Sequence, residues 1–235
     1  MAVFHFKEFS IEQSNEVFKI GTDALILGAF CIKYSNNVDS ALDIGCGTGV
    51  LGHILAKHFK DAQVTGIDLN TEAVKLANKN AKNNSLNDRL SFKNISLSEF
   101  ANNSKFDLII SNPPFFNNSL KNNKGSNTLA RHDDQLTIED LLTRAKQMLK
   151  ADGNFWFIYP FDRAEEVRIN LQGRGFNIHR EILIYGKKEI PVRIIFSVSK
   201  KKQIFQKESL VLRNKNGDYT NNYKELTREL HGHEL

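Results

Sequence analysis

The stretch that decides the fold is Asp43-Ile44-Gly45-Cys46-Gly47-Thr48-Gly49. It follows a short apolar segment, residues 40–44, and precedes a segment with one apolar face, residues 50–58. Glycines at a strand-to-helix junction permit a tight turn and let a ligand approach the backbone closely. Three alternating glycines after an acid therefore predict a ligand-binding loop behind the first strand of a parallel sheet.

Outward from this loop, strand-like and helix-like segments alternate, which is typical of a doubly wound α/β fold with a parallel sheet. The last two strands are joined by the short turn Gly186-Lys187-Lys188 with no helix between them, so they must pair antiparallel. We expect a mostly parallel seven-stranded sheet with one antiparallel strand near its edge. The expected strands are 40–44, 63–67, 90–94, 106–111, 155–159, 176–185 and 192–199, and the expected helices are 24–33, 50–58, 71–82, 138–150 and 163–171.

The two ends of the chain extend this core. Apolar residues near period two predict one or two strands around a kink over residues 4–11, and a further short strand over 17–20. Thr22-Asp23 is expected to cap the first helix. The tail is expected to hold a strand over 209–212 and a helix over 222–231. We expect one domain, with an N-terminal extension (1–38), a catalytic core (39–200) and a C-terminal strand and helix (201–235).

Length and composition exclude several classes of protein. The chain has 235 residues, of which 40% are hydrophobic and 25% charged, as in an ordinary soluble globular protein. No run approaches the roughly 18 apolar residues of a membrane span, and residues 1–8 contain no apolar signal segment. Two cysteines, Cys31 and Cys46, fit a reducing compartment. We therefore expect a cytoplasmic protein with no membrane partner, and the sequence indicates no obligatory protein partner.

The net charge of +5 is unevenly distributed. Residues 182–215 alone carry nine basic and two acidic side chains, so a surface for nucleic acid is expected in the C-terminal half. Lys187 and Lys188 follow a parallel strand, on the edge of the sheet where the glycine loop lies. Lys200-Lys201-Lys202 ends the reversed strand, on the far edge, and we expect less RNA contact from it.

Two ligands compete for the glycine loop. Residues 47–52 fit the G-x-G-x-x-G dinucleotide pattern, and Asp68 lies where an acid meets ribose hydroxyls in such folds. Asp43, however, puts a carboxylate beside the loop, which disfavours a pyrophosphate and suits a cationic group. S-adenosylmethionine carries a sulfonium, an ammonium and a ribose but no phosphate. The loop therefore favours S-adenosylmethionine over NAD as the cofactor.

The fourth expected strand runs into Asn112-Pro113-Pro114-Phe115, at the carboxyl end of the sheet where ligands bind. An exocyclic amine on a base or amide is a poor nucleophile because its lone pair is delocalised. The Asn112 side-chain carbonyl and the Pro113 carbonyl can each accept one N–H, which orients the nitrogen toward a sulfonium methyl without a metal. Phe115 offers a face on which a flipped-out base can stack. Asp107, inside the strand, is expected to be a structural hydrogen-bond partner.

The glycine loop resembles that of class I S-adenosylmethionine-dependent methyltransferases, whose fold is Rossmann-like. The resemblance implies that Asp68 and its neighbour Leu69 bind the cofactor ribose. It also implies that Asn94 or Ser96, after the third strand, meets the adenine, although neither is the Asp that many relatives have. Asn112-Pro113-Pro114-Phe115 resembles the motif of enzymes that methylate adenine N6, guanine N2 or glutamine amides.

The segment from Phe18 to Gly28 is similar to the one before the cofactor loop in tRNA1(Val) adenine-37 N6-methyltransferases. With the chain start, both motifs and the Gly217-Asp218-Tyr219-Thr220 tail, this resemblance covers nearly the whole sequence. It implies methylation of adenine 37 in a tRNA anticodon loop. It also implies that Thr22 and Asp23 lie near the methionine end of the cofactor and that Arg131 contacts an RNA phosphate.

Other functions remain open from the sequence. Guanine-N2 methyltransferases of ribosomal RNA share the Asn-Pro-Pro-Phe motif but usually carry a further N-terminal domain. Release-factor glutamine methyltransferases typically have Asn-Pro-Pro-Tyr and a helical N-terminal domain. An inactive scaffold fits poorly with two complete motifs, and an NAD oxidoreductase is supported by the glycine pattern alone.

Overall fold

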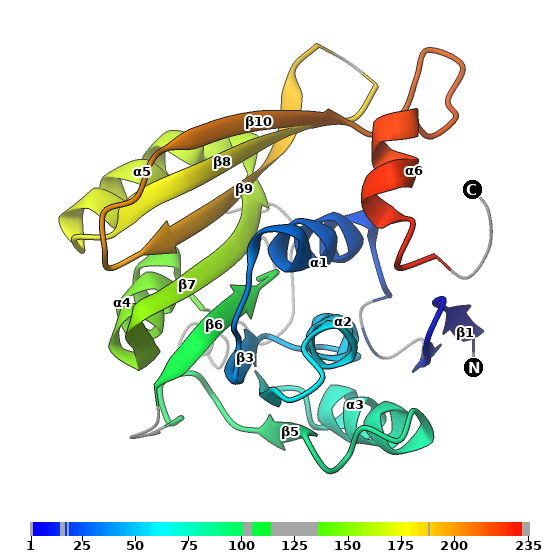
Figure 1. The fold of residues 1–235 in the computed structure, drawn as a ribbon. Helices are drawn as coiled ribbons and strands as arrows, with labels where there is room; N and C mark the ends of the chain where they lie inside the picture. Colours follow the sequence, from blue (N-terminus) through cyan, green and yellow to red (C-terminus); the bar gives the residue numbers. More distant parts are fainter. Residues whose placement is uncertain are drawn as a thin grey trace, which may run out of the picture.

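The structure, a computed structural model, describes residues 2–14, 17, 19–100, 105–113, 136–187 and 189–231. Its centre is an eight-stranded sheet with strand order β10-β8-β9-β7-β6-β3-β4-β5 (Figure 1). The strands are β3 (Ser40–Ile44), β4 (Gln63–Asp68), β5 (Leu90–Asn94), β6 (Phe106–Ser111), β7 (Leu149–Pro160), β8 (Asn177–Tyr185), β9 (Pro191–Ser199) and β10 (Gln206–Val211).

The pairing directions confirm the predicted fold class. The four strand pairs β3–β4, β4–β5, β3–β6 and β6–β7 are all parallel. Strand β9 runs antiparallel to both β7 and β8, as the short turn between the last two predicted strands required. The carboxyl ends of β3, β4, β6, β7 and β8 therefore lie on one edge of the sheet, which we call the carboxyl edge. The opposite edge is the amino edge.

The sheet has eight strands where the sequence predicted seven. The additional strand is β10, which was expected only as part of the tail and which pairs parallel with β8, Gln206 opposite Arg180 and Val211 opposite Tyr185. The sequence of β10 does not reveal that β8 is its partner, because the unpaired edge of β8 can accept any strand of suitable length. Strand β7 is also longer than predicted, since Met148 ends the preceding helix and Leu149 already pairs with Phe106.

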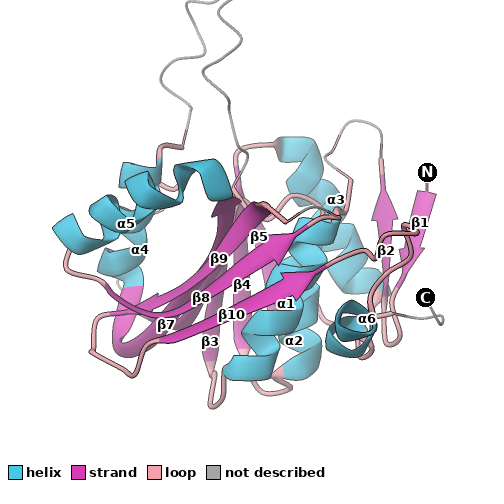
Figure 2. Cartoon of the chain, turned by 90° about the horizontal axis from the view of Figure 1, so that it is seen from above, coloured by secondary structure: helices cyan, strands magenta, loops and turns pink. Residues whose placement is uncertain are grey.

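Helices cover both faces of the sheet (Figure 2). One apolar cluster packs α1 (Thr22–Tyr34), α2 (Val50–His58), α3 (Thr71–Asn83) and α6 (Asn221–Thr227) against it. A second cluster packs α4 (Ile138–Met148) and α5 (Ala164–Gly173), which follows the short turn η1 (Phe161–Arg163), against the other face. The first cluster joins residues of the N-terminal extension, the core and the tail, among them Phe6, Leu51 and Leu230.

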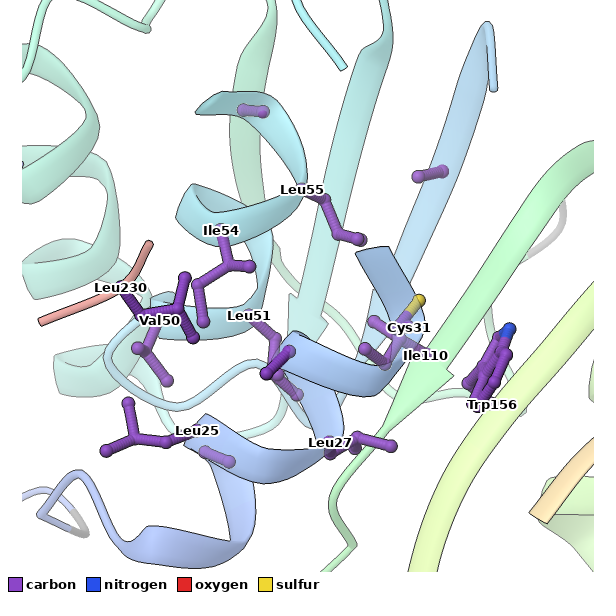
Figure 3. Packing of buried hydrophobic residues seen from close by; sticks show 14 of the residues in the cluster. Leu25, Leu27, Cys31, Val50, Leu51, Ile54, Leu55, Ile110, Trp156 and Leu230 are labelled. Atoms are coloured by element: carbon purple, nitrogen blue, oxygen red, sulfur yellow. The ribbon is translucent and has the colours of Figure 1, made fainter. Parts of the chain in front are cut away.

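Helix α1 packs closely on α2, and side chains of both helices share one apolar cluster with Ile110 and Trp156 of the sheet (Figure 3). A Cβ on Gly28 would lie 2.8 Å from Ile54 Cδ1, so a glycine lets the two helices approach. Leu25 and Leu27 of α1 and Leu51 of α2 are buried in the same cluster. This packing removes their apolar surface from water, the main stabilising contribution in such a layered fold.

The N-terminal extension forms a hairpin of β1 (Ala2–His5) and β2 (Ser10–Gln13), as residues 4–11 predicted. Asn80 of α3 is fully buried and ties this hairpin to the core: its Oδ1 accepts the Glu12 N–H at 2.9 Å, and its Nδ2 donates to Thr48 O at 3.3 Å. The strand predicted over 17–20 is wrong for its described residues, Val17, Lys19 and Ile20, which lie in no strand.

Gly66→Ala should destabilise the fold, because a Cβ there would lie 2.6 Å from Phe92 Cε1 and 3.0 Å from Cys46 Cβ. Overpacking of this kind costs about 1–3 kcal/mol in free energy of unfolding, which urea denaturation measures. Adding Phe92→Leu should recover part of the loss. The control is Gly173→Ala, whose Cβ meets nothing within 4 Å; equal effects of the two alanines would contradict the packing.

Candidate active site

Positive backbone angles explain the glycines of the loop between β3 and α2. Gly45, Gly47 and Gly49 have φ values of 72°, 52° and 82°, a region that other residues rarely adopt. A Cβ on Gly45 or Gly47 would meet nothing within 4 Å, so the space in front of these two residues is open. Gly49 is the N-cap of α2, and there a Cβ would also lie 2.6 Å from Phe92 Cζ. The loop thus presents bare backbone to solvent on one side and packs tightly on the other.

Hydrogen bonds tie this loop to the end of β4. The Gly45 and Cys46 N–H groups both donate to Ile67 O, at 2.9 and 3.0 Å. The Gly47 N–H donates to Asp68 Oδ2 at 2.8 Å. Asp68 therefore sits at the predicted place, at the tip of β4 and beside the glycine loop.

Asp43 lies beneath the loop and is fully buried. Its Oδ2 accepts the Gly52 N–H at 3.1 Å, while its Oδ1 has no hydrogen-bond partner among the described residues. Burial raises the pKa of Asp43 to about 7; the Gly52 N–H partly offsets this and the charge of Asp68 adds to it. An unsatisfied buried carboxylate oxygen is costly, and a ligand with a donor or a positive charge would satisfy it. A phosphate would instead meet two carboxylates, so the site fits a cationic cofactor better than a dinucleotide.

The loops after β4 and β5 are joined by Asn94. Its Nδ2 donates to Asp68 O at 3.0 Å and to Leu69 O at 2.9 Å, and its Oδ1 accepts from Thr71 Oγ1. Leu69 is 52% exposed, which is unusual for leucine and leaves an apolar surface next to Asp68. Ser96 Oγ bonds within its own turn, to Glu99 Oε2 at 2.7 Å. The roles of Asn94 and Ser96 at the adenine stay predictions; the geometry shows Asn94 holding the Asp68–Leu69 backbone.

The end of β6 lies beside the glycine loop. Ile44 and Ser111 are register partners, and the Ser111 hydroxyl donates to Ile44 O at 2.9 Å. Asn112 directly follows Ser111, as Gly45 directly follows Ile44, so the chain leaves both strands at the same level. Asn112 is half-buried and Pro113 is buried. The structure thus brings the first half of the tetrapeptide to the predicted cofactor loop, while Phe115 lies outside the described residues.

Thr22 and Asp23 do not cap α1, contrary to the sequence prediction. The N-cap is Gly21, without a side-chain hydrogen bond, and Thr22 is already helical. Asp23 Oδ2 instead accepts from Arg193 Nε at 2.8 Å. Arg193 pairs with Pro160 at the carboxyl end of β7, so this ion pair fastens the first turn of α1 at the carboxyl edge. A carboxylate in the first turn is also favoured by the helix dipole.

The other predicted residues divide between described and undescribed parts. Lys187 follows β8 at the carboxyl edge, as expected, and a Cβ on Gly217 would lie 2.9 Å from its Nζ. Lys188 and Arg131 lie outside the described residues. Asp107 has the structural role expected of it, since its Oδ2 accepts from Ser40 and Lys150 at the amino edge. Burial alone would raise the pKa of Asp107, but these hydrogen bonds hold it below its ordinary value.

Sequence reasoning missed three residues that support the site. Arg193 anchors Asp23, and Asn80 anchors the N-terminal hairpin to Thr48 of the loop. The buried His53 donates from Nδ1 to Gly49 O at 2.7 Å and stacks between Phe9 and Phe92. Burial lowers the pKa of His53, which keeps the ring neutral. One sequence signal could have identified all three: Arg193 stands in an apolar strand segment, and His53 and Asn80 stand on the apolar faces of their helices.

Comparison with known proteins identifies the family of the chain. Residues 14–170 match the family described as "Methyltransferase small domain". A protein of Pedobacter heparinus named tRNA1(Val) (adenine(37)-N6)-methyltransferase is 34% identical over 96% of both chains. A Vibrio campbellii protein of the same name is 31% identical over 97% of this chain and 95% of its own.

Solved structures share the fold at lower identity. A predicted O-methyltransferase of Agrobacterium tumefaciens superimposes with a TM-score of 0.67 at 17% identity, covering 88% of this chain and 96% of its own. A ribosomal protein L11 methylase of Lactobacillus delbrueckii gives 0.57 at 20% identity, covering 80% and 82%.

Asp43→Asn should stabilise the protein more at pH 8 than at pH 4.5. The native pKa of about 7 lies above the ordinary aspartate value of about 3.9. The native state therefore keeps its proton while the unfolded state loses it, and stability falls as pH rises from about 4 to 7. Asparagine removes this penalty, and the variant-minus-wild-type difference in Tm should grow with pH. Asp107→Asn, at a carboxylate ionised in both states across this range, should give a constant difference; a constant difference for Asp43→Asn would refute its buried protonated form.

Proposed function

This chain belongs to the methyltransferase small domain family and to the tRNA1(Val) (adenine(37)-N6)-methyltransferases within it, and from this we propose how its residues perform the reaction. The protein is an enzyme that transfers a methyl group from S-adenosylmethionine to N6 of adenine 37 in tRNA. The observation that carries the site assignment is the hydrogen bond from Ser111 to Ile44 O, which sets Asn112 next to Gly45.

The cofactor is assigned to the open side of the glycine loop. The unpartnered Oδ1 of Asp43 and the bare backbone of Gly45 and Gly47 support this assignment. When bound, S-adenosylmethionine supplies an electrophilic methyl group on a sulfonium. We assign its binding to Thr22, Asp23, Asp43, Gly45, Gly47, Gly49, Asp68, Leu69, Asn94, Ser96 and Asn112.

The catalytic role falls to the tetrapeptide after β6. Asn112 accepts one N6–H in its side-chain carbonyl and Pro113 accepts the other in its backbone carbonyl, so both hold the amine with its lone pair directed at the cofactor. The half-buried position of Asn112 and the buried ring of Pro113 support a rigid orientation. Phe115 stacks on the adenine once it leaves the loop. No base is needed before transfer, because the methylated nitrogen releases its proton to water.

The substrate approaches the carboxyl edge. We assign contacts with the anticodon loop to Lys187, Lys188 and Arg131, because cations position RNA through its phosphates. A single-stranded loop is a favourable target, since its bases unstack at low cost. No described helix is long and apolar enough to cross a membrane. We further propose that the chain acts in the cytoplasm as one domain without an obligatory protein partner.

Asp68→Asn and Asp68→Ala should both weaken S-adenosylmethionine binding about tenfold or more, since each removes the charged acceptor proposed for the ribose. Isothermal titration calorimetry measures this. Asparagine keeps an oxygen for the Gly47 N–H, so a loss in that variant reports on the ligand more than on the loop. Asp107→Ala, at the amino edge, is the control; wild-type affinity in both Asp68 variants would overturn the cofactor placement.

Asn112→Ala should abolish methyl transfer to tRNA, because the amine loses an acceptor that orients it, while cofactor affinity falls far less, because the other assigned residues still hold the cofactor. The test is mass spectrometry of tRNA nucleosides from cells that lack the gene, complemented with either wild type or variant. Wild type should restore N6-methyladenosine and Asn112→Ala should not. Restoration by the variant would refute the orientation mechanism. An unchanged N6-methyladenosine level in the deletion would redirect the assignment to ribosomal RNA or a release factor.

A further inference from the structure

Four cationic side chains gather at the amino edge, on the side of the sheet covered by α4 and α5. Lys146, Arg174 and Lys200 line one shallow depression together with Thr143 and Gln147. Lys105, at the start of β6, donates to Gln147 O on its rim. We call Lys105, Lys146, Arg174 and Lys200 the amino-edge patch. Its members come from four separate parts of the chain, so only the fold assembles it.

Part of this charge has a structural purpose. Lys146 Nζ donates to Arg174 O and to Gly175 O, the latter at 3.0 Å, just beyond α5. Lys200 Nζ donates to Leu149 O at 2.6 Å, just beyond α4. Cations at helix C-termini are favoured because the last carbonyls are unpaired and the dipole is negative there.

The structural purpose accounts for only a fraction of the charge. Each helix C-terminus is equivalent to about half a negative charge, so two helix ends balance about one of four cations. Two acids of the amino edge are engaged by other lysines: Asp107 pairs with Lys150, and Asp152 pairs with Lys201. A surplus of about three positive charges remains at the patch.

Mutual repulsion within the patch is visible in Lys200. Burial lowers its pKa, and the charges of Lys105 and Lys146 lower it further. Arg174 stays directed into the depression by a hydrogen bond from its Nε to Thr143 Oγ1 at 2.9 Å. A group of cations that repel one another over an open depression is stabilised by an anion.

We propose that the amino-edge patch binds backbone phosphates of the substrate tRNA at a distance from the methylated base. This inference rests on the proposed function. An open depression with cations on several elements suits a polyanion that lies across the surface, whereas a free small anion is held best in an enclosed site. The exposed Lys202 continues the positive surface beyond Lys200. The patch therefore gives a function to the lysine run from which the sequence predicted little.

The length of the sheet decides which part of the tRNA reaches the patch. Strand β9 runs between the two edges over nine residues and pairs with β7 without a register shift, and at about 3.3 Å per residue its ends are about 30 Å apart. An anticodon stem of about five base pairs, at no more than about 3.4 Å per pair, covers only part of that distance. The patch should thus contact the body of the tRNA beyond the anticodon arm.

The test compares Arg174→Gln/Lys200→Gln with wild type in binding fluorescein-labelled full-length tRNA and an isolated anticodon stem-loop. Lys105 and Lys146 are kept. The variant should bind full-length tRNA at least tenfold more weakly. The slope of log association constant against log salt concentration should become less negative by about two, because two phosphate contacts are lost. Stem-loop affinity should be unchanged. Arg174→Lys/Lys200→Arg, which keeps both charges, should retain wild-type binding.

The control variant is Lys60→Gln/Lys82→Gln. Lys60 lies just beyond the end of α2 and Lys82 in the last turn of α3; both are exposed, and both helices cover the face of the sheet opposite α4 and α5. The tRNA affinity and salt slope of this control should match wild type. Unchanged tRNA affinity in the patch variant overturns the inference, as does equal weakening for the stem-loop. If inorganic phosphate raises the Tm of wild type but not of the patch variant, and the patch variant keeps wild-type tRNA affinity, the patch binds a small anion instead. Failure of wild type to methylate tRNA would refute the proposed function itself.

Discussion

The hydrogen bond from the Gly47 N–H to Asp68 Oδ2 is the contact on which the site depends. It joins the loop after β3 to the tip of β4, and the Gly45 and Cys46 N–H groups reinforce it by donating to Ile67 O. The loop is thereby held in a conformation with positive φ that only glycine adopts readily. Because Ser111 is hydrogen-bonded to Ile44 on the other side of β3, the same loop also positions Asn112.

Apolar packing protects this arrangement from behind. The Phe92 ring fills the space that side chains on Gly49 and Gly66 would need, and His53 stacks against it while donating to Gly49 O. A neutral histidine serves here, since burial lowers its pKa and a charged ring would be left unpaired. The loop is therefore rigid on its inner side and open on its outer side, which is the combination that a preorganised cofactor site requires.

Charge is divided between the two edges of the sheet. The carboxyl edge holds Asp43 and Asp68, which suit a cofactor that is itself cationic, while the amino edge collects lysines and an arginine that suit phosphate. Asp107 is an acid at the amino edge, near the start of β6, where the Lys150 ammonium neutralises it and the Ser40 hydroxyl donates to it. Strand β6 thus holds an acid with a structural role near its start, and the amide proposed for catalysis, Asn112, directly follows its end.

The parallel α/β fold, the reversed strand, the glycine loop and the positions of Asp68 and Asn112 could all be predicted from the sequence, because each depends on local periodicity or on backbone angles that glycine and proline impose. Three features became known from the folded chain alone: the Asp23–Arg193 ion pair, the place of β10 beside β8, and the gathering of Lys105, Lys146, Arg174 and Lys200. The first two contacts join residues 170 and 26 positions apart, and the third joins four separate segments. Their partners are set by which surfaces packing brings together, and a linear pattern carries no record of that.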